Sequence, residues 1–260
     1  MQKRRGVAHA ITVITGTALL AACSAGPPDP VVSQAATPAP AQTDARSLLA
    51  ARVAVAKDQR YVAAYTLTVT GRAPRTILVT VATDRTWRVD IQGGALGGTA
   101  DVAIANRPEG QYQCPINPSN GCVKVAGSNK RMPPGIDPRV QLVFISWLDV
   151  LLDRAIPMAV APAAPLAGTS APCFAVEPGV TAVAPPIDPG TFCYNDSGIL
   201  TAAKLPLGQL MLTGEVVAAP PTIALPGPVI TGSPLGTSPP PPPPPSSAPA
   251  SVPPSVKASR

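Results

Sequence analysis

Histidine is almost missing from this chain of 260 residues. The single one, His9, lies in the N-terminal stretch that is interpreted below as a signal peptide. A mature protein without that stretch has no histidine. This excludes Ser-His-Asp and Cys-His nucleophilic catalysis, a histidine general base and histidine-ligated metal sites.

Charged and aromatic residues are also scarce, at 13% and 3% of the chain. The few acids form no recognisable pair, and the glycine-rich run 93–98 lacks the Lys-Ser/Thr ending of a phosphate loop, so we expect a flexible loop there. Lys124, Ser128 and Lys130 lie close in sequence but do not have the SxxK spacing of a Ser-Lys enzyme. We therefore predict a protein that is not an enzyme and has no cofactor and no metal.

The N-terminus has the pattern of an export signal. Three basic residues at 3–5 precede an apolar stretch over 7–20, and the sequence then reads Leu20-Ala21-Ala22-Cys23. This segment resembles the lipobox of bacterial lipoproteins, which implies cleavage after residue 22 and a diacylglyceryl (palmitate-type) anchor on Cys23. The expected location is the extracytoplasmic side of the cell membrane. An ordinary cleaved signal with a chance cysteine is the alternative.

Composition then divides the mature chain. Residues 23–42 are proline-rich and indicate a flexible tether, 43–230 are long enough for one domain, and 231–260 contain the unbroken proline run 239–245. A proline run favours an extended rod and cannot build a core, so we expect 231–260 to be disordered. Loss of the basic residues 3–5 lowers the net charge from +6 to +3, which is too little to indicate nucleic-acid binding.

Four cysteines remain beyond the proposed anchor: Cys114, Cys122, Cys173 and Cys193. In an exported protein they indicate two disulfides, for which three pairings exist. We favour Cys114–Cys122, which brackets a turn-rich segment, together with Cys173–Cys193, which joins two short strand-like runs. A metal site is the alternative, but the spacing contains no CxxC pair.

The domain is predicted to begin with a helix and to continue as an antiparallel sheet. Residues 44–57 place Leu48, Leu49 and Val53 at helical spacing, with Thr43 or Asp44 as the N-cap. Apolar and polar residues then alternate with a period of two, the pattern of half-buried strands. The expected strands are 65–70, 76–83, 86–92, 99–106, 110–114 and 122–126, followed later in the chain by 158–161, 173–176, 191–194, 199–203 and 210–217.

A central helix is predicted over 137–155. Asp137-Pro138 is a typical start, and Pro157 is a typical stop. Only Ser146, Asp149 and Asp153 would form a polar strip, so the helix should be buried. The fold class expected is α+β, a curved antiparallel sheet (an unclosed half-barrel) wrapped around this buried apolar helix.

The element order, the lipobox and the run Phe192–Leu200 resemble the LolA/LolB-like unclosed β-barrel, in particular the LppX/LprG-like lipoproteins of mycobacterial envelopes. The resemblance covers about 43–229 and implies a non-enzymatic protein that binds or carries a lipid or lipoglycan in an apolar hollow. The side chains expected to line that hollow are Trp87, Val89, Ile91, Phe144, Trp147, Leu148 and Leu151. The alternative for the same seven is a plain packed core, in a structural or interaction lipoprotein whose proline-rich tail binds a partner.

Overall fold

The computed structural model describes residues 44–118, 120–179 and 185–241. The predicted signal peptide, Cys23, the tether and most of the proline run lie outside these residues. The helices are α1 (Ala45–Asp58) and α2 (Ser146–Leu152), with short 3₁₀ turns η1 (Leu96–Gly98), η2 (Pro134–Ile136) and η3 (Val140–Phe144). The strands are β1 (Tyr61–Thr68), β2 (Arg75–Val81), β3 (Trp87–Ala95), β4 (Ala100–Arg107), β5 (Gly110–Pro115), β6 (Cys122–Ala126), β7 (Met158–Ala163), β8 (Cys173–Pro178), β9 (Gly190–Tyr194), β10 (Leu200–Leu205), β11 (Gly208–Ala218) and β12 (Val229–Ile230).

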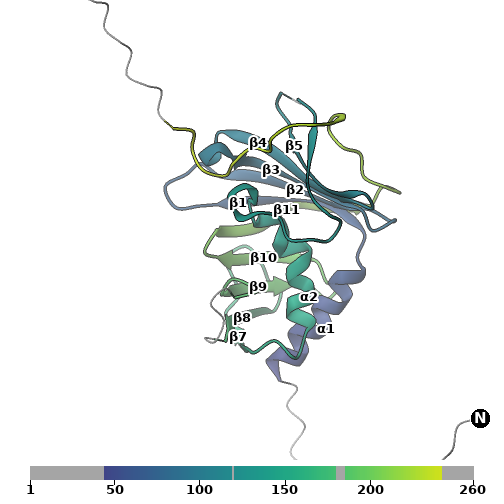
Figure 1. Cartoon of the computed structure of the whole chain (residues 1–260). Helices are drawn as coiled ribbons and strands as arrows, with labels where there is room; N and C mark the ends of the chain where they lie inside the picture. Colours follow the sequence, from purple (N-terminus) through teal and green to yellow (C-terminus); the bar gives the residue numbers. More distant parts are fainter. Residues whose placement is uncertain (1–43, 119, 180–184, 242–260) are drawn as a thin grey trace, which may run out of the picture. The chain divides into compact units, whose positions relative to one another are not determined.

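All twelve strands belong to one unclosed sheet, in the order β12-β6-β5-β4-β3-β2-β1-β11-β10-β9-β8-β7. Two antiparallel meanders, β1 to β6 and β7 to β11, meet where β1 pairs with β11 (Figure 1). The sheet is mixed rather than purely antiparallel as expected, because β12 pairs parallel with β6. The fold is therefore mostly β, with two helices.

The helix α1 forms where the sequence predicts it. The Asp44 side chain accepts a hydrogen bond from the Ser47 backbone N–H at 2.8 Å, so Asp44 is the N-cap. Leu49, Val53 and Ala56 bury one face of the helix. The helix lies beside α2, where Lys57 forms an ion pair with Asp149 (Figure 1).

The predicted central helix is much shorter than expected. Arg139 has a left-handed backbone (φ 66°, ψ −22°), and Ile145 is also non-helical (φ −122°, ψ −87°). These two interruptions leave a 3₁₀ turn, η3, and only seven residues of α2. The predicted polar strip is correct, because Ser146, Asp149 and Asp153 are exposed while Trp147, Leu148 and Leu151 are buried.

One face of the sheet carries the main core. In β1 the buried residues alternate with more exposed ones, as half-buried strands require. The buried side chains of β1, β2, β3 and β4 join those of α1, η3 and α2 in a single apolar cluster. This inner face is where the predicted ligand residues lie.

The two disulfides are Cys114–Cys122 and Cys173–Cys193, which confirms the predicted pairing. They lie on the outer face: Phe174 and Phe192 belong to the main core, whereas the adjacent residues Cys173 and Cys193 belong to a separate small cluster. The first disulfide joins β5 to β6, and the second joins directly opposed residues of β8 and β9. Both therefore brace neighbouring strands.

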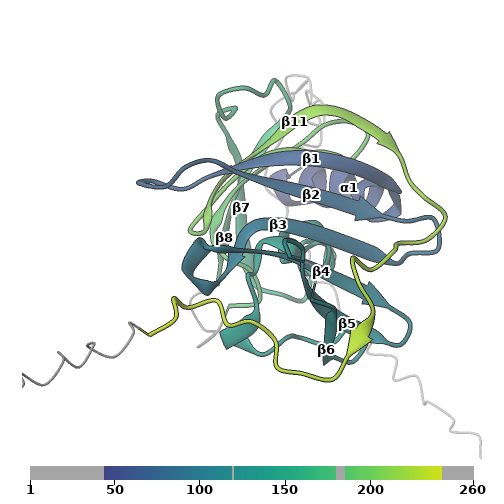
Figure 2. The ribbon, with the colours of Figure 1, turned by 90° about the horizontal axis from the view of Figure 1, so that it is seen from above.

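The chain after β11 crosses the outer face of the first meander before it forms β12 (Figure 2). Thr83 N–H donates to Pro220 O at 3.0 Å, and Cys122 N–H donates to Pro228 O at 2.7 Å. Ile223 is buried against Ala82 and Ala105. The parallel strand β12, which the sequence analysis did not predict, follows from this crossing.

Residues 231–241, which the sequence places in the tail, make ordered contacts with the sheet. Leu96 N–H donates to Gly236 O at 2.8 Å, and Gly97 N–H donates to Thr237 O at 2.9 Å. The glycine-rich run is therefore not the flexible loop that was expected: it ends β3, forms η1 and is held by the tail. No helix within the described residues is long and apolar enough to cross a membrane.

Candidate ligand-binding site

The structure brings the seven predicted ligand residues together. All belong to the main core cluster, and none is more than 8% exposed. They come from β3 and, about fifty residues later, from the neighbouring elements η3 and α2. Their burial fits a core role, and a ligand could reach them only through a cavity that opens to this cluster.

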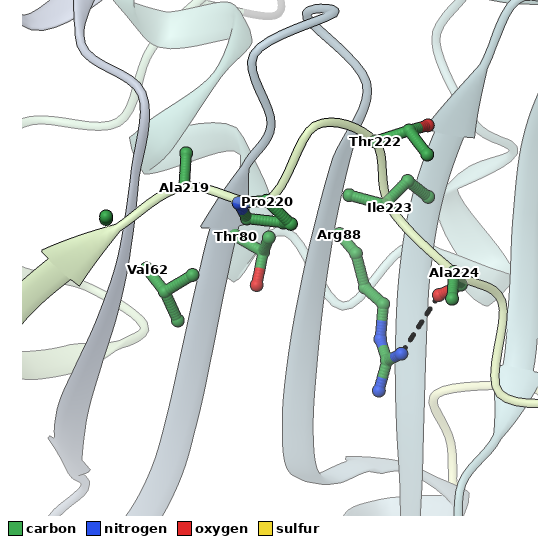
Figure 3. Close-up of a pocket in the computed structure, with 9 residues that line it drawn as sticks. Val62, Thr80, Arg88, Ala219, Pro220, Thr222, Ile223 and Ala224 are labelled. Carbon is green, nitrogen blue, oxygen red and sulfur yellow. Dashed lines mark hydrogen bonds between the residues drawn. The ribbon is translucent and has the colours of Figure 1, made fainter.

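One cavity, of about 480 Å³, lies on the outer face between the sheet and the crossing segment (Figure 3). We call it the outer cavity. It is lined by Val62, Thr80 and Arg88 of the sheet and by Ala218, Ala219, Pro220, Thr222, Ile223 and Ala224. Arg88 is its only charged lining residue, and it is already paired: Nε and Nη2 each lie 2.6 Å from an oxygen of Asp90, and Nη1 donates to Ala224 O at 3.0 Å. The guanidinium of Arg88 is therefore already hydrogen-bonded within the protein. None of the seven predicted residues lines the outer cavity.

A second cavity, of about 280 Å³, opens where the β1–β2 and β3–β4 connections meet η3 and the tail. We call it the mouth cavity. Its apolar wall is formed by Leu67, Ile91, Val140 and Leu207. Three of these, Leu67, Ile91 and Val140, are also members of the main core cluster. Of the seven predicted residues, Ile91 lines the mouth cavity and the other six do not.

The polar part of the mouth cavity is dominated by arginine. Arg72, Arg75 and Arg139 line it together with one carboxylate, Asp137. Arg75 Nη1 donates to Gly93 O at 2.7 Å, whereas its Nε is buried without a partner among the described residues. Burial lowers the pKa of the Arg75 guanidinium, and the positive charge of Arg72 lowers it further.

Two of the acidic side chains near this rim, Asp188 and Asp137, interact with Arg139, and a third, Asp101, accepts from the Gly93 backbone N–H at 2.8 Å. Arg139 Nη2 lies 2.7 Å from Asp188 Oδ1. Asp137 Oδ1 accepts from the Arg139 backbone N–H at 2.8 Å and from Gln141 Nε2 at 2.6 Å. No ion pair among the described residues involves Arg72 or Arg75. The rim therefore carries two guanidinium groups that lack a carboxylate.

A second polar feature lies inside the core. The hydroxyls of Tyr65 and Tyr194 are buried without a well-formed hydrogen bond to a described residue, and the hydroxyl of Tyr61 interacts with that of Tyr65. Burial raises the pKa of Tyr61 to about 12 and raises the pKa values of Tyr65 and Tyr194 as well, and the Tyr61 hydroxyl adds to the rise in both. The three tyrosine hydroxyls are therefore polar groups within an otherwise apolar core.

Sequence reasoning missed both features. A signal for the rim was present: Arg72 and Arg75 lie between the first two predicted strands, and the run 93–98 follows the third predicted strand. In an antiparallel meander these two connections lie at the same end of the sheet. The tyrosines carry no comparable signal, because alternating aromatic residues are typical of any buried strand face.

The described residues contain no group of three or more His, Cys, Asp or Glu side chains that could hold a metal ion. The four cysteines there are taken up by the disulfides. No protein-family model matches the sequence, and a search of curated proteins finds no relative. The resemblance to the LolA/LolB-like barrel therefore stays a prediction.

Proposed function

We propose that this protein is a membrane-tethered envelope lipoprotein that binds the acyl chain of a lipid-like ligand at the mouth cavity. The observation that carries the proposal is that Leu67, Ile91 and Val140 belong both to the cavity wall and to the main core. An apolar chain that enters there meets core side chains instead of polar surface. Burial of such a chain is favourable by about 0.8 kcal/mol per CH₂.

The volume of the mouth cavity limits how much of an acyl chain it can hold. Its volume of about 280 Å³ is close to the lower end of ligand pockets, roughly 300 Å³. In this proposal the unclosed sheet is a half-barrel wrapped around α2, and Ile91 contacts the ligand. The six other predicted residues form the apolar wall behind it.

A binding assay with a matched pair of variants tests this proposal. Leu207 lines the mouth cavity and is only partly buried, so Leu207→Trp should fill the cavity and leave the fold intact. Leu78 lies on β2 between the core residues Ile77 and Val79 and is 37% exposed, so Leu78→Trp adds the same bulk on the outer face. Titration of the full chain with a fluorescent fatty acid should show binding that is lost in the first variant and kept in the second.

A specific observation favours the alternative, an anchored interaction protein with a packed core: the seven predicted residues are all buried. Native mass spectrometry of the full chain from its own host separates the two functions. Copurifying acyl species support ligand binding. Their absence, together with no saturable fatty-acid binding, refutes it and leaves the interaction protein.

The predicted membrane location can be tested separately from ligand binding. We propose that Cys23 carries the lipid anchor, on the strength of the Leu20–Cys23 segment. Intact-mass measurement should show a diacylglyceryl addition on a chain that begins at Cys23, and fractionation should place it with membranes. The variant Cys23→Ala should lose both. An unmodified wild-type cysteine would refute the anchor without bearing on the cavity.

A further inference from the structure

We propose that Arg72 and Arg75 form a binding site for a phosphate-bearing headgroup at the rim of the mouth cavity. The claim that the ligand has an acyl chain rests on the function proposed above. The claim that its headgroup carries a phosphate rests on the geometry of the two arginines.

Arg75 is placed to hold an anion because its guanidinium is fixed but not satisfied. It begins β2, and its Nη1 is anchored by Gly93 O at 2.7 Å. Its Nε is buried without a partner among the described residues. A buried donor without an acceptor is unfavourable by about 1–3 kcal/mol, and by more when it is charged. Arg75 also lines the mouth cavity, so a small rotation of its guanidinium would bring this donor to an oxygen of a bound anion.

Arg72 is the second positively charged side chain at this part of the rim. It lies in the β1–β2 connection, and its Nη1 donates to Gly97 O at 3.4 Å. A Cβ atom added to Gly98 would lie 3.3 Å from Arg72 Nη1 and 4.0 Å from Arg75 Nη1. Both guanidiniums therefore approach the same glycine, where the contact with Arg72 leaves little space for a side chain. Like charges this near to one another favour an anion between them.

The charge and the planar shape of the two guanidinium groups indicate a phosphate-bearing headgroup. Planar guanidinium groups bind phosphate and carboxylate oxygens through paired hydrogen bonds. Two arginines without a carboxylate partner match a group with several charged oxygens better than a single neutral one. Because Leu67, Ile91 and Leu207 form the other wall of the cavity, the ligand must be amphipathic. This is the chemistry of an anionic phospholipid or a phosphate-bearing glycolipid.

The third rim arginine is not needed for this site. Arg139 is paired with Asp188, and Asp137 accepts from its backbone. Its charge is therefore compensated within the protein, while those of Arg72 and Arg75 are not.

The test compares ligands that share acyl chains and differ in the headgroup. The full chain, purified in a neutral detergent, is titrated with fluorescent short-chain phosphatidylglycerol, phosphatidylcholine and diacylglycerol, and with inorganic phosphate alone. We expect phosphatidylglycerol to bind at least about tenfold more tightly than diacylglycerol, the effect of one charge-assisted hydrogen bond. Phosphatidylcholine carries a compensating positive charge and should lie between the two.

Variants assign the preference to the rim. Arg72→Gln removes an exposed side chain and should leave the fold intact, and Arg75→Gln removes the partly buried one. Each should weaken phosphatidylglycerol binding about tenfold and leave diacylglycerol binding unchanged. The control is Arg107→Gln, which removes the same charge at the other end of β4, where Arg107 pairs with the exposed Glu109.

The outcomes separate this inference from the proposed function. Equal binding of phosphatidylglycerol and diacylglycerol, unchanged by Arg72→Gln, overturns the headgroup site and leaves acyl binding standing. Arginine-dependent binding of inorganic phosphate without any lipid binding supports the anion site and refutes the acyl ligand. No binding of any of the four compounds overturns both.

Discussion

The side chain of Gln113 holds the backbone of Leu235. Gln113 Oε1 accepts from Leu235 N–H at 2.6 Å, and Gln113 Nε2 donates to Leu235 O at 3.0 Å and to Ile136 O at 3.2 Å. Gln113 is only 1% exposed on β5. One buried amide therefore fastens the start of the tail to the sheet, beside the mouth cavity.

Replacing this amide should destabilise the domain. In Gln113→Ala the backbone groups of Leu235 and Ile136 lose their partners, and we expect a decrease of about 1–3 kcal/mol in the free energy of unfolding. Gln92→Ala is the control, because the Gln92 side chain is exposed and accepts a single hydrogen bond from Thr76 N–H. Denaturant unfolding measures both. Equal effects would show that the Leu235 contact contributes nothing.

Two truncations should differ for the same reason. A chain that ends after residue 230 lacks Leu235, Gly236 and Thr237, so Gln113 and η1 lose their partners. A chain that ends after residue 241 keeps them. We expect a lower Tm for the first truncation and an unchanged Tm for the second. If both retain the full Tm, residues 231–241 are not part of the folded domain.

The buried hydroxyl of Tyr65 makes no well-formed hydrogen bond to a described residue and interacts only with the hydroxyl of Tyr61, so its removal should change the stability of the protein little. Tyr65 is 0% exposed, and its ring lies 4.7 Å from that of Phe144. Tyr65→Phe keeps this ring contact and should leave the free energy of unfolding unchanged or raise it by about 1 kcal/mol. Tyr65→Ala removes the ring and should cost about 3–5 kcal/mol. A substantial loss in Tyr65→Phe would reveal a stabilising hydrogen bond to Tyr61, to a buried water or to a ligand.

Alkaline pH should unfold the protein through its buried tyrosines. An acid whose pKa is raised in the folded state stabilises the fold fully below its unfolded pKa, and this stabilisation is lost as the pH rises through the folded value. For Tyr61 the window lies between its ordinary pKa of 10 and the folded value of about 12. Stability should therefore fall above pH 10, with tyrosinate absorbance appearing together with the loss of circular dichroism. Tyr61→Phe should shift this transition to higher pH; an unchanged transition would exclude Tyr61 as a contributor.

The two disulfides should contribute unequally. Cys114–Cys122 spans 8 residues of sequence and Cys173–Cys193 spans 20. Loop-closure entropy then predicts losses of about 2.5 and about 3.3 kcal/mol when each pair is replaced by alanine. Thermal unfolding of the two double variants should show the larger loss for the second pair. The reverse order would indicate that packing in the small outer clusters outweighs chain entropy.

Most elements were predictable because they depend on local patterns. The period-two alternation around Tyr65, Ile77 and Val89 indicates strands whose partners follow within a few residues. Residues 195–198 are of types that favour tight turns, and they form one: Gly198 N–H donates to Asn195 O at 3.0 Å. The disulfide pairing also followed from short separations and strand-like flanks.

Where the sequence analysis was wrong, a distant contact decided the structure. The helix predicted from Asp137 does not continue through Arg139, whose backbone is left-handed and whose side chain pairs with Asp188. The strand β12 has two residues, and its parallel pairing with β6 depends on the crossing segment that precedes it. Neither interaction leaves a periodic signal near the residues that it changes.

By itself, the sequence determined the helix α1, eleven of the strands and the disulfides, because each depends on residue type and short-range spacing. Only the tertiary structure decided where polar groups meet the apolar face. Arg72 and Arg75 approach Gly98 because two hairpin ends of one meander lie together, and the tail reaches this place because Gln113 holds Leu235. These approaches join residues far apart in the chain, and residue order alone does not encode them.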